Sequence, residues 1–298
     1  MALVSDVGYI LEASNTWGLI ALSLVLMPLN WSLEALKWKL LLKKKENISF
    51  PLALKAVFSG ATISAVSPNR TGDYFARVFV LKKTKFWEGV FITLIGSYAQ
   101  SITTLIFGGI AFFTFFTPLL LASEYVSIQN IKLFTALYYI SLVVVIILYY
   151  KISLLSSVFP KRWNRIHKYV TIFSQYKFSE LSITLAISIL RYLVFSFQFY
   201  ILFIAVGFSK MSLIQGLAII SVVFLINTIR PSIALLELGI RGSVVIFVVS
   251  VFYANSNVHI ENAALTASSL LWLINIILPA IIGLFFIKDL RFFKSRER

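Results

Sequence analysis

The chain has 298 residues, of which 59% are hydrophobic and 13% are charged, and its mean hydropathy is +0.89. The hydrophobic fraction and the hydropathy exceed those of soluble domains, and the charged fraction is lower than theirs. The sequence therefore predicts an all-α, polytopic membrane bundle forming a single transmembrane domain over residues 1–298, without room for a large soluble catalytic module. The absence of cysteine excludes disulfides and thiolate metal sites.

Seven apolar runs are long enough to be predicted as membrane spans. They cover about residues 17–36, 87–112, 132–150, 181–206, 213–229, 242–254 and 263–287. The sixth run is short for a span, so residues before Arg241 must also lie within the membrane for it to cross. Six tryptophans lie mainly near the ends of these runs and are interpreted as interfacial anchors: Trp17, Trp31, Trp38, Trp87, Trp163 and Trp272.

The 27 basic residues outnumber the 12 acidic ones, for a net charge of +15, and their placement predicts the orientation. Basic residues cluster in segments 37–45, 70–85, 151–177 and 288–298, whereas the other connections carry Lys132 and Lys210. By the positive-inside rule these four segments are cytoplasmic, so the C-terminus lies inside and, with seven crossings, the N-terminus lies outside. We therefore expect a multi-pass membrane protein with a cytoplasmic tail at 288–298.

The basic loop at about residues 151–180 mixes lysine and arginine with apolar residues. This mixture is typical of an amphipathic helix lying on anionic headgroups. Nucleic acid is accordingly not an expected partner.

Two stretches are predicted to be re-entrant or broken elements. The first, about residues 50–68, is apolar but has basic residues on both flanks, so it is expected to enter and leave on the cytoplasmic side. The second, about residues 230–241, is interrupted by Pro231. In transporters, Pro- or Gly-interrupted segments at corresponding places in two halves indicate the binding site.

The two stretches share a weak motif. In each, a proline lies beside an arginine, and an acidic residue is followed four positions later by another arginine. The first motif contains Pro68, Arg70, Gly72, Asp73 and Arg77, and the second contains Arg230, Pro231, Glu237, Gly239 and Arg241.

These segments, SPNRTGDYFARVFVL (67–81) and RPSIALLELGIRGSVVIF (230–247), together with Glu34, Lys37, Trp38 and Leu41, resemble the lysylphosphatidylglycerol synthase membrane-domain family, also called the flippase-like domain family. The resemblance covers nearly the whole chain. It implies an inner-membrane protein related to the domain that moves aminoacylated phosphatidylglycerol between leaflets, with two re-entrant elements facing a central cavity.

The chain departs from this family in three respects. Members usually begin with one more span, and they often carry paired glycines where this chain has Ala234, Leu235 and Leu236. The sequence also contains no soluble aminoacyltransferase domain, so lipid lysylation is not expected of it.

The charged motif residues allow two interpretations. Asp73 with Arg77, and Glu237 with Arg241, are spaced to pair on one helix face, which could be purely structural neutralisation. Alternatively, the excess of arginine forms a site for a lipid phosphate. The candidate headgroup-binding residues are Arg70, Arg77, Arg191, Arg230 and Arg241, with Asp73 and Glu237 as charge partners.

Arg191 lies near the middle of the fourth predicted span, on the same helical face as Thr184 and Gln198. At that depth it should either line a polar cavity or be held by a carboxylate or carbonyl. A polar stripe in the second span fits either a cavity lining or close helix packing: Ser97, Gln100, Ser101, Thr104 and Gly108.

The sequence shows no catalytic motif. The histidines, His167 and His259, fall on opposite predicted sides, so no two-histidine metal site is expected. No catalytic residues and no cofactor are expected either. The leading hypothesis is transport or flipping of an anionic phospholipid or lipid-linked intermediate. The alternative is a non-catalytic scaffold that holds a lipid- or envelope-modifying membrane enzyme. The sequence does not indicate an oligomeric state.

Overall fold

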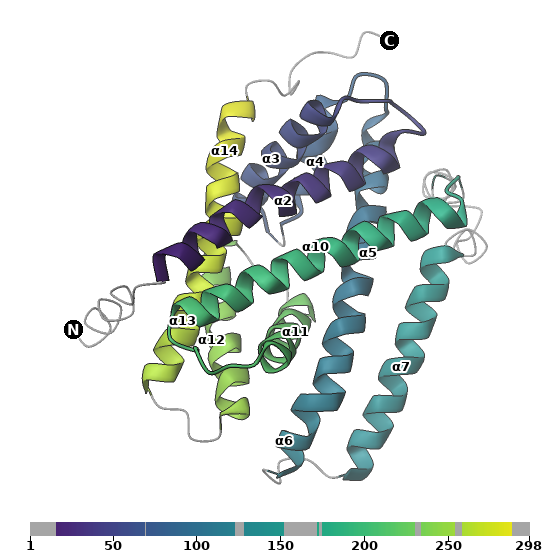
Figure 1. The fold of residues 1–298 in the computed structure, drawn as a ribbon. Coiled ribbons are helices and arrows are strands. Elements are labelled where there is room, and N and C mark those ends of the chain that lie inside the picture. Colours follow the sequence, from purple (N-terminus) through teal and green to yellow (C-terminus); the bar gives the residue numbers. More distant parts are fainter. Residues whose placement is uncertain are drawn as a thin grey trace.

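A computed structural model describes residues 16–68, 70–122, 128–151, 172, 175–229, 234–253 and 258–287. These residues form helices and contain no β-strand (Figure 1). In chain order the elements are α2 (Thr16–Leu42), α3 (Phe50–Val66), α4 (Gly72–Ala76), the 3₁₀ turn η1 (Arg77–Val80), α5 (Phe86–Ala111), the π-helical turn η2 (Phe112–Phe116), α6 (Thr117–Ala122), α7 (Ile128–Tyr150), α10 (Phe178–Ala205), α11 (Leu213–Ile229), α12 (Ala234–Phe252), α13 (Val258–Trp272), the π-helical turn η3 (Leu273–Ile277) and α14 (Leu278–Ile287).

The predicted helical membrane class is confirmed, with changes at the ends of the spans. Five helical segments are long and apolar enough to cross a membrane: Thr16–Leu42, Phe86–Ala122, Ile128–Tyr150, Phe178–Ala205 and Val258–Ile287. Helices α11 and α12 occupy the fifth and sixth predicted runs but are shorter in their apolar parts. The first helix continues to Leu42, beyond the predicted end near residue 36, which places additional charged residues inside the helix. The number of crossings and the orientation stay predictions.

Helices α2 and α10 lie side by side across the front of the bundle (Figure 1). Small buried residues, including Ser23, Ser188 and Ser196, let the two backbones approach closely. Two side chains then bond across the contact: Gln198 Nε2 donates to the Ser23 carbonyl at 2.7 Å, and Thr16 Oγ1 donates to the Ala205 carbonyl at 3.1 Å. This pair of helices forms one wall of the interior.

The first stretch predicted to be re-entrant forms a hairpin, and its second arm follows the predicted segment. Helix α3 starts after Ser49, whose hydroxyl accepts from the Leu52 N–H at 3.4 Å, and it is continuous to Val66. The chain then turns, and α4 and η1 pack back along α3. The hairpin therefore extends to Val80, because residues 50–68 alone cover just the first arm and the start of the turn.

The two ends of this hairpin meet at Glu46. Its carboxylate accepts from the backbone N–H groups of Lys82, Lys83 and Thr84 at 3.0, 2.8 and 3.0 Å. The chain consequently leaves and returns at one place. Which side of a membrane this place occupies stays a prediction.

The second predicted element lies largely outside the described residues. These include neither residues 230–233 nor the side chains of residues 234–238, whereas the helix α12 itself begins at Ala234. The predicted loop at 151–180 is described at 151, 172 and from 175 onward, and the tail at 288–298 is not described.

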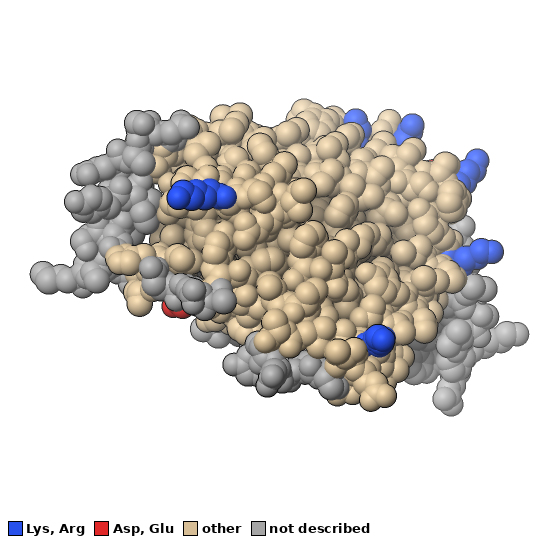
Figure 2. All heavy atoms as spheres, turned by 60° about the horizontal axis from the view of Figure 1, so that its bottom comes forward, with Lys and Arg blue, Asp and Glu red and all other residues tan. Residues whose placement is uncertain are grey.

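The exterior is dominated by apolar side chains. On α7, Tyr149 is the one buried residue, and large apolar side chains such as Leu137, Ile140 and Val143 are exposed. Figure 2 shows a broad face with isolated basic side chains near its margins. Such a surface suits contact with lipid acyl chains.

Candidate functional site

Two neighbouring cavities lie between α2, the α3–α4 hairpin, α5, α10 and α11, and α12 and η3 also line one of them. The ion-pair chamber, of about 270 Å³, is lined by the charged residues Glu34, Lys37, Arg70, Asp73, Arg77 and Arg191. The amide chamber, of about 210 Å³, is lined by polar residues that include Asn30, Gln100, Asn227, Arg241 and Asn275. Six residues line both: Trp31, Arg70, Gln100, Thr104, Arg191 and Thr228.

Glu34 is the centre of the ion-pair chamber. Its Oε2 lies 2.8 Å from Lys37 Nζ and 3.0 Å from Arg191 Nη1, and its Oε1 accepts from Arg77 Nη1 at 2.8 Å. The residue is 5% exposed, so this carboxylate depends on its cations for compensation. One side chain thereby joins α2, η1 and α10.

Arg77 is fully engaged by carboxylates. Its Nε donates to Asp73 Oδ1 at 2.7 Å, its Nη2 donates to Asp73 Oδ2, and its Nη1 donates to Glu34. The bidentate contact forms the i, i+4 pair that the sequence predicts. Helix α3 makes room for it, because a Cβ at Gly60 would lie 2.1 Å from Asp73 Oδ1.

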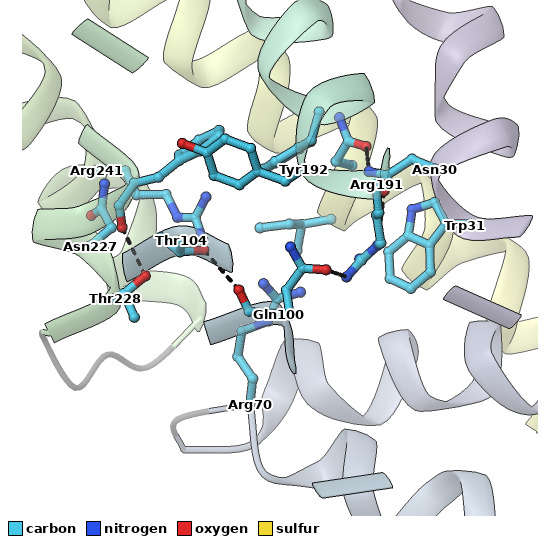
Figure 3. A pocket seen from close by; sticks show the side chains of 14 residues that line it. Asn30, Trp31, Arg70, Gln100, Thr104, Arg191, Tyr192, Asn227, Thr228 and Arg241 are labelled. Atoms are coloured by element: carbon cyan, nitrogen blue, oxygen red, sulfur yellow. Dashed lines mark hydrogen bonds between the residues drawn. The ribbon is translucent and has the colours of Figure 1, made fainter. Parts of the chain in front are cut away.

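Arg191 is both held by a carboxylate and exposed to the cavities, which unites the two alternatives predicted for it. Besides Glu34, its Nε donates to Asn30 Oδ1 at 2.9 Å and its Nη1 to Gln100 Oε1 at 3.3 Å (Figure 3). Its guanidinium carbon lies 5.9 Å from the centre of the Trp31 ring system. Arg191 therefore stands at the boundary between the chambers.

The residues predicted to share the face of Arg191 do not line either chamber. Thr184 donates to the Glu180 carbonyl of its own helix at 2.8 Å, and Gln198 bonds to α2 as described above. Both are buried packing residues.

Arg70 presents a different case. It lies in the turn between α3 and α4 with φ at +56°, the one positive φ of a residue other than glycine among the described residues. This left-handed conformation is unfavourable for a side chain with a Cβ, and such strain is concentrated at functional sites. Arg70 lines both chambers, and it has no carboxylate partner within the described part of the chain.

The polar stripe of α5 divides between its two predicted roles. Four of its members line the ion-pair chamber: Ser97, Gln100, Ser101 and Thr104. The fifth, Gly108, packs against α11, where an added Cβ would lie 2.6 Å from Leu225 Cβ. The cavity interpretation thus applies to the first four residues and the packing interpretation to Gly108.

The two sequence motifs contribute to one cavity. Arg70 from the first and Arg241 from the second both line the amide chamber, and Figure 3 shows them with Arg191 around it. Arg230, Pro231 and the side chain of Glu237 lie outside the described residues. Of the remaining motif residues, Gly72 packs tightly on Ile63 and Ser67, Pro68 is exposed before the turn, and Gly239 has open space around it.

A family model described as the lysylphosphatidylglycerol synthase TM region matches residues 1–286. The chain belongs to this family. No curated protein and no solved structure matches it. The match confirms the resemblance inferred from the motifs, and it supports a membrane-associated, lipid-related role for the chain.

In this lysylphosphatidylglycerol synthase TM-region protein, the centre of the site includes residues that were not predicted as site residues. Glu34 and Lys37 fall at the predicted end of the first span and were expected near its margin, whereas α2 continues past both. Their i, i+3 spacing within an apolar helix was the available signal. Asn30 and Asn275 gave no such signal, because their contact, at 3.3 Å, joins residues 245 positions apart.

The tryptophan prediction is wrong for two residues. Trp31 is 6% exposed, stacks on Phe58 and lines both chambers, and the buried Trp38 donates to Thr93 Oγ1 at 3.0 Å. Both are buried because α2 packs here against other helices, Trp31 against Phe58 of α3 and Trp38 against Thr93 of α5. Trp17 and Trp87 are exposed, as interfacial anchors require.

The side chains that line the site include groups that can bind an anion. Guanidinium groups bind phosphate oxygens in a bidentate manner, and amide and hydroxyl groups beside them can bind the rest of a headgroup. Within the described residues, no group of three or more His, Cys, Asp or Glu could hold a metal ion.

Proposed function

We propose that this protein moves an anionic phospholipid or lipid-linked intermediate between membrane leaflets, with the headgroup passing through the two chambers. The observation that carries the proposal is the pair Arg70 and Arg191, two arginines that line both chambers inside an apolar bundle. Arg70 supplies a guanidinium without a carboxylate partner in the described residues. Arg191 supplies a guanidinium that contacts both a carboxylate and neutral amide groups.

Charge and size support this assignment. A buried surplus of positive charge is costly unless water or an anion compensates it. Chambers of about 210 and 270 Å³ are smaller than the roughly 300–1,000 Å³ of pockets that enclose drug-sized ligands. They suit a headgroup whose acyl chains remain outside, against apolar helix surfaces.

The proposed orientation places the hairpin ends at the cytoplasmic face of the inner membrane. Lys45 and Lys83 lie on either side of the Glu46 contacts, and each can be changed to cysteine because the chain contains none. An impermeant thiol reagent should label both from the cytoplasmic side. Labelling of the two positions from opposite sides contradicts the topology.

The function is tested in proteoliposomes that contain trace acyl-labelled fluorescent phosphatidylglycerol or phosphatidylcholine. An impermeant quencher is added outside. Labelled phosphatidylglycerol of the inner leaflet should move to the outer leaflet and lose its fluorescence faster when the protein is present. Arg191→Gln and Arg70→Gln should each abolish or strongly reduce this movement while the amount of inserted protein stays normal. Lys132→Gln, at the start of α7 and away from the chambers, provides the charge-matched control.

The same measurement separates transport from the scaffold alternative. A scaffold leaves lipid movement at the rate of protein-free vesicles and tolerates Arg191→Gln, but it loses its cellular role when the basic loop at 151–180 is altered. Degradation of the Arg191→Gln protein would instead assign this arginine to holding the bundle together.

A further inference from the structure

The charge balance of the ion-pair chamber carries information about its ligand. Its described lining includes four cations, Lys37, Arg70, Arg77 and Arg191, and two carboxylates, Glu34 and Asp73. Two positive charges therefore remain after pairing among these described lining residues. A ligand with one negative charge would leave one of them uncompensated in a site surrounded by apolar helices.

The positions of the carboxylates show where the surplus lies. Arg77 is satisfied by Asp73 and Glu34 through three nitrogens and takes no further part. Lys37 is 1% exposed and has Glu34 as its close charged partner, which it shares with Arg77 and Arg191. The surplus is consequently shared among Lys37, Arg191 and Arg70, and of these three Arg70 has no carboxylate partner among the described residues.

Resting on the function proposed above, we infer that the chamber selects a doubly charged phosphate, the headgroup of a lipid phosphomonoester, over a singly charged phosphodiester. Arg70 approaches from the hairpin turn, Arg191 from α10 and the buried Lys37 from α2, where it also contacts Glu34. Three cations from three elements can contact separate oxygens of one terminal phosphate. A phosphodiester has one fewer charged oxygen to offer and carries a second ester group toward the same space.

The experiment measures binding by the full-length protein in detergent. The probes are dioctanoyl phosphatidic acid and farnesyl monophosphate, which are phosphomonoesters on a glycerolipid and an isoprenoid, and dioctanoyl phosphatidylglycerol and phosphatidylcholine. At pH 7.5 the phosphomonoesters should bind about tenfold more tightly than phosphatidylglycerol, because one more charge-assisted contact forms. Tighter binding of one phosphomonoester than the other identifies the lipid backbone that the protein prefers.

The pH dependence gives a second, independent readout. The second ionisation of a phosphomonoester has a pKa near 6, so its affinity should rise from pH 5.5 to pH 7.5, while that of phosphatidylglycerol stays flat. The titratable or charged groups that face the chamber are Glu34 and Lys37 of α2, Arg70 of the turn, Asp73 and Tyr74 of α4, Arg77 of η1 and Arg191 of α10. The lining residues from α3, α5 and α11 are not titratable, and no described lining residue is a histidine, the side chain that ordinarily titrates in this range.

Arg70→Gln is the decisive variant, because this side chain holds no described carboxylate and its loss leaves the internal pairs intact. It should lower phosphomonoester affinity about tenfold at pH 7.5 and remove most of its preference over phosphatidylglycerol. Lys82→Gln, an exposed charge-matched change outside both chambers, should leave the preference unchanged.

The outcomes separate this inference from the proposed function. Equal, pH-independent binding of phosphatidic acid and phosphatidylglycerol, both weakened by Arg70→Gln, overturns the doubly charged ligand and leaves transport of anionic lipid standing. Binding of every probe no better than phosphatidylcholine, unaffected by Arg70→Gln, overturns both.

Discussion

Helices α2 and α7 are both long and apolar, yet α2 packs into the interior of the bundle and α7 lies mostly on its surface. Helix α2 contributes Asn30, Glu34 and Lys37 to the interior, and 39% of its most apolar 18-residue stretch is buried. In helix α7, 6% of the corresponding 18-residue stretch is buried. This helix contacts α5 through Tyr138 and Tyr98, whose hydroxyls donate to backbone carbonyls of the other helix. Polar residues within a span therefore indicate which helices line the site better than the apolar content of the span does.

The sharpest test of this comparison is Glu34→Gln in α2. Removing the carboxylate leaves Lys37, Arg77 and Arg191 without their shared partner, which should lower the free energy of unfolding by about 3–5 kcal/mol. Thermal or denaturant unfolding in detergent measures the loss. Adding Lys37→Met should recover part of it, since one buried charge of the opposite sign is removed as well. An unchanged midpoint in Glu34→Gln would show that the network does not hold the helices together.

A smaller effect is expected from Gly60→Ala in α3. The new methyl group would overlap Asp73 Oδ1 and force the Asp73–Arg77 pair to move, which should cost about 1–3 kcal/mol and weaken anionic-lipid binding. Gly239→Ala in α12 is the matched control, because nothing lies within 4 Å of its added Cβ. Equal stability of the two variants in an unfolding series would mean that the hairpin accommodates the methyl group by shifting as a unit.

Glu46, at the ends of the hairpin, should have a pH-dependent effect. Burial alone raises the pKa of its carboxyl, but N–H donors from Lys83, Lys82 and Thr84, together with the Thr84 hydroxyl, lower it overall from 4.5. The stabilising contribution is therefore complete above pH 4.5 and is lost as the pH falls through the lower folded-state value. Glu46→Gln should cost about 1–2 kcal/mol at pH 7 and flatten stability below pH 4.5.

The control for Glu46 is Glu88→Gln, which makes the same charge change. Glu88 forms a looser ion pair, 3.6 Å from Lys45 Nζ, and its loss should cost less than about 1 kcal/mol. If both variants retain the same acid sensitivity as the unaltered protein, the Glu46 contacts are not what closes the hairpin.

The smallest effect is expected on α7. Leu137 is 53% exposed, so Leu137→Ala should change the free energy of unfolding by less than about 0.5 kcal/mol in detergent. A loss comparable to that of a buried leucine would show that a protein surface covers this face, and would weaken the contrast with α2. Leu33→Ala, at a buried position of α2, supplies the comparison.

The sequence predicted the helices and part of the site because those features depend on local patterns. Apolar runs indicate spans, the i, i+4 spacing indicated the Asp73–Arg77 pair, and the depth of Arg191 indicated a polar environment. The position of Glu34 could not be assigned in the same way, because its importance arises from Arg77 and Arg191 reaching it from distant parts of the chain. Likewise, the return arm of the hairpin depends on the Glu46 contacts, which join segments 36–38 residues apart.

The π-helical turn η3 has a consequence for how this family of cavities can diverge. It divides α13 from α14 and supplies Asn275, which reaches Asn30, with Ile276 beside it in the amide chamber. A π-turn holds one more residue than an α-helical turn, so deleting a single residue here would restore a continuous α-helix while α13 and α14 keep the faces that they present to the bundle. One codon lost at this turn would thus change which side chain reaches the cavity, the amide of Asn275 or the aliphatic chain of Ile276, without turning either helix.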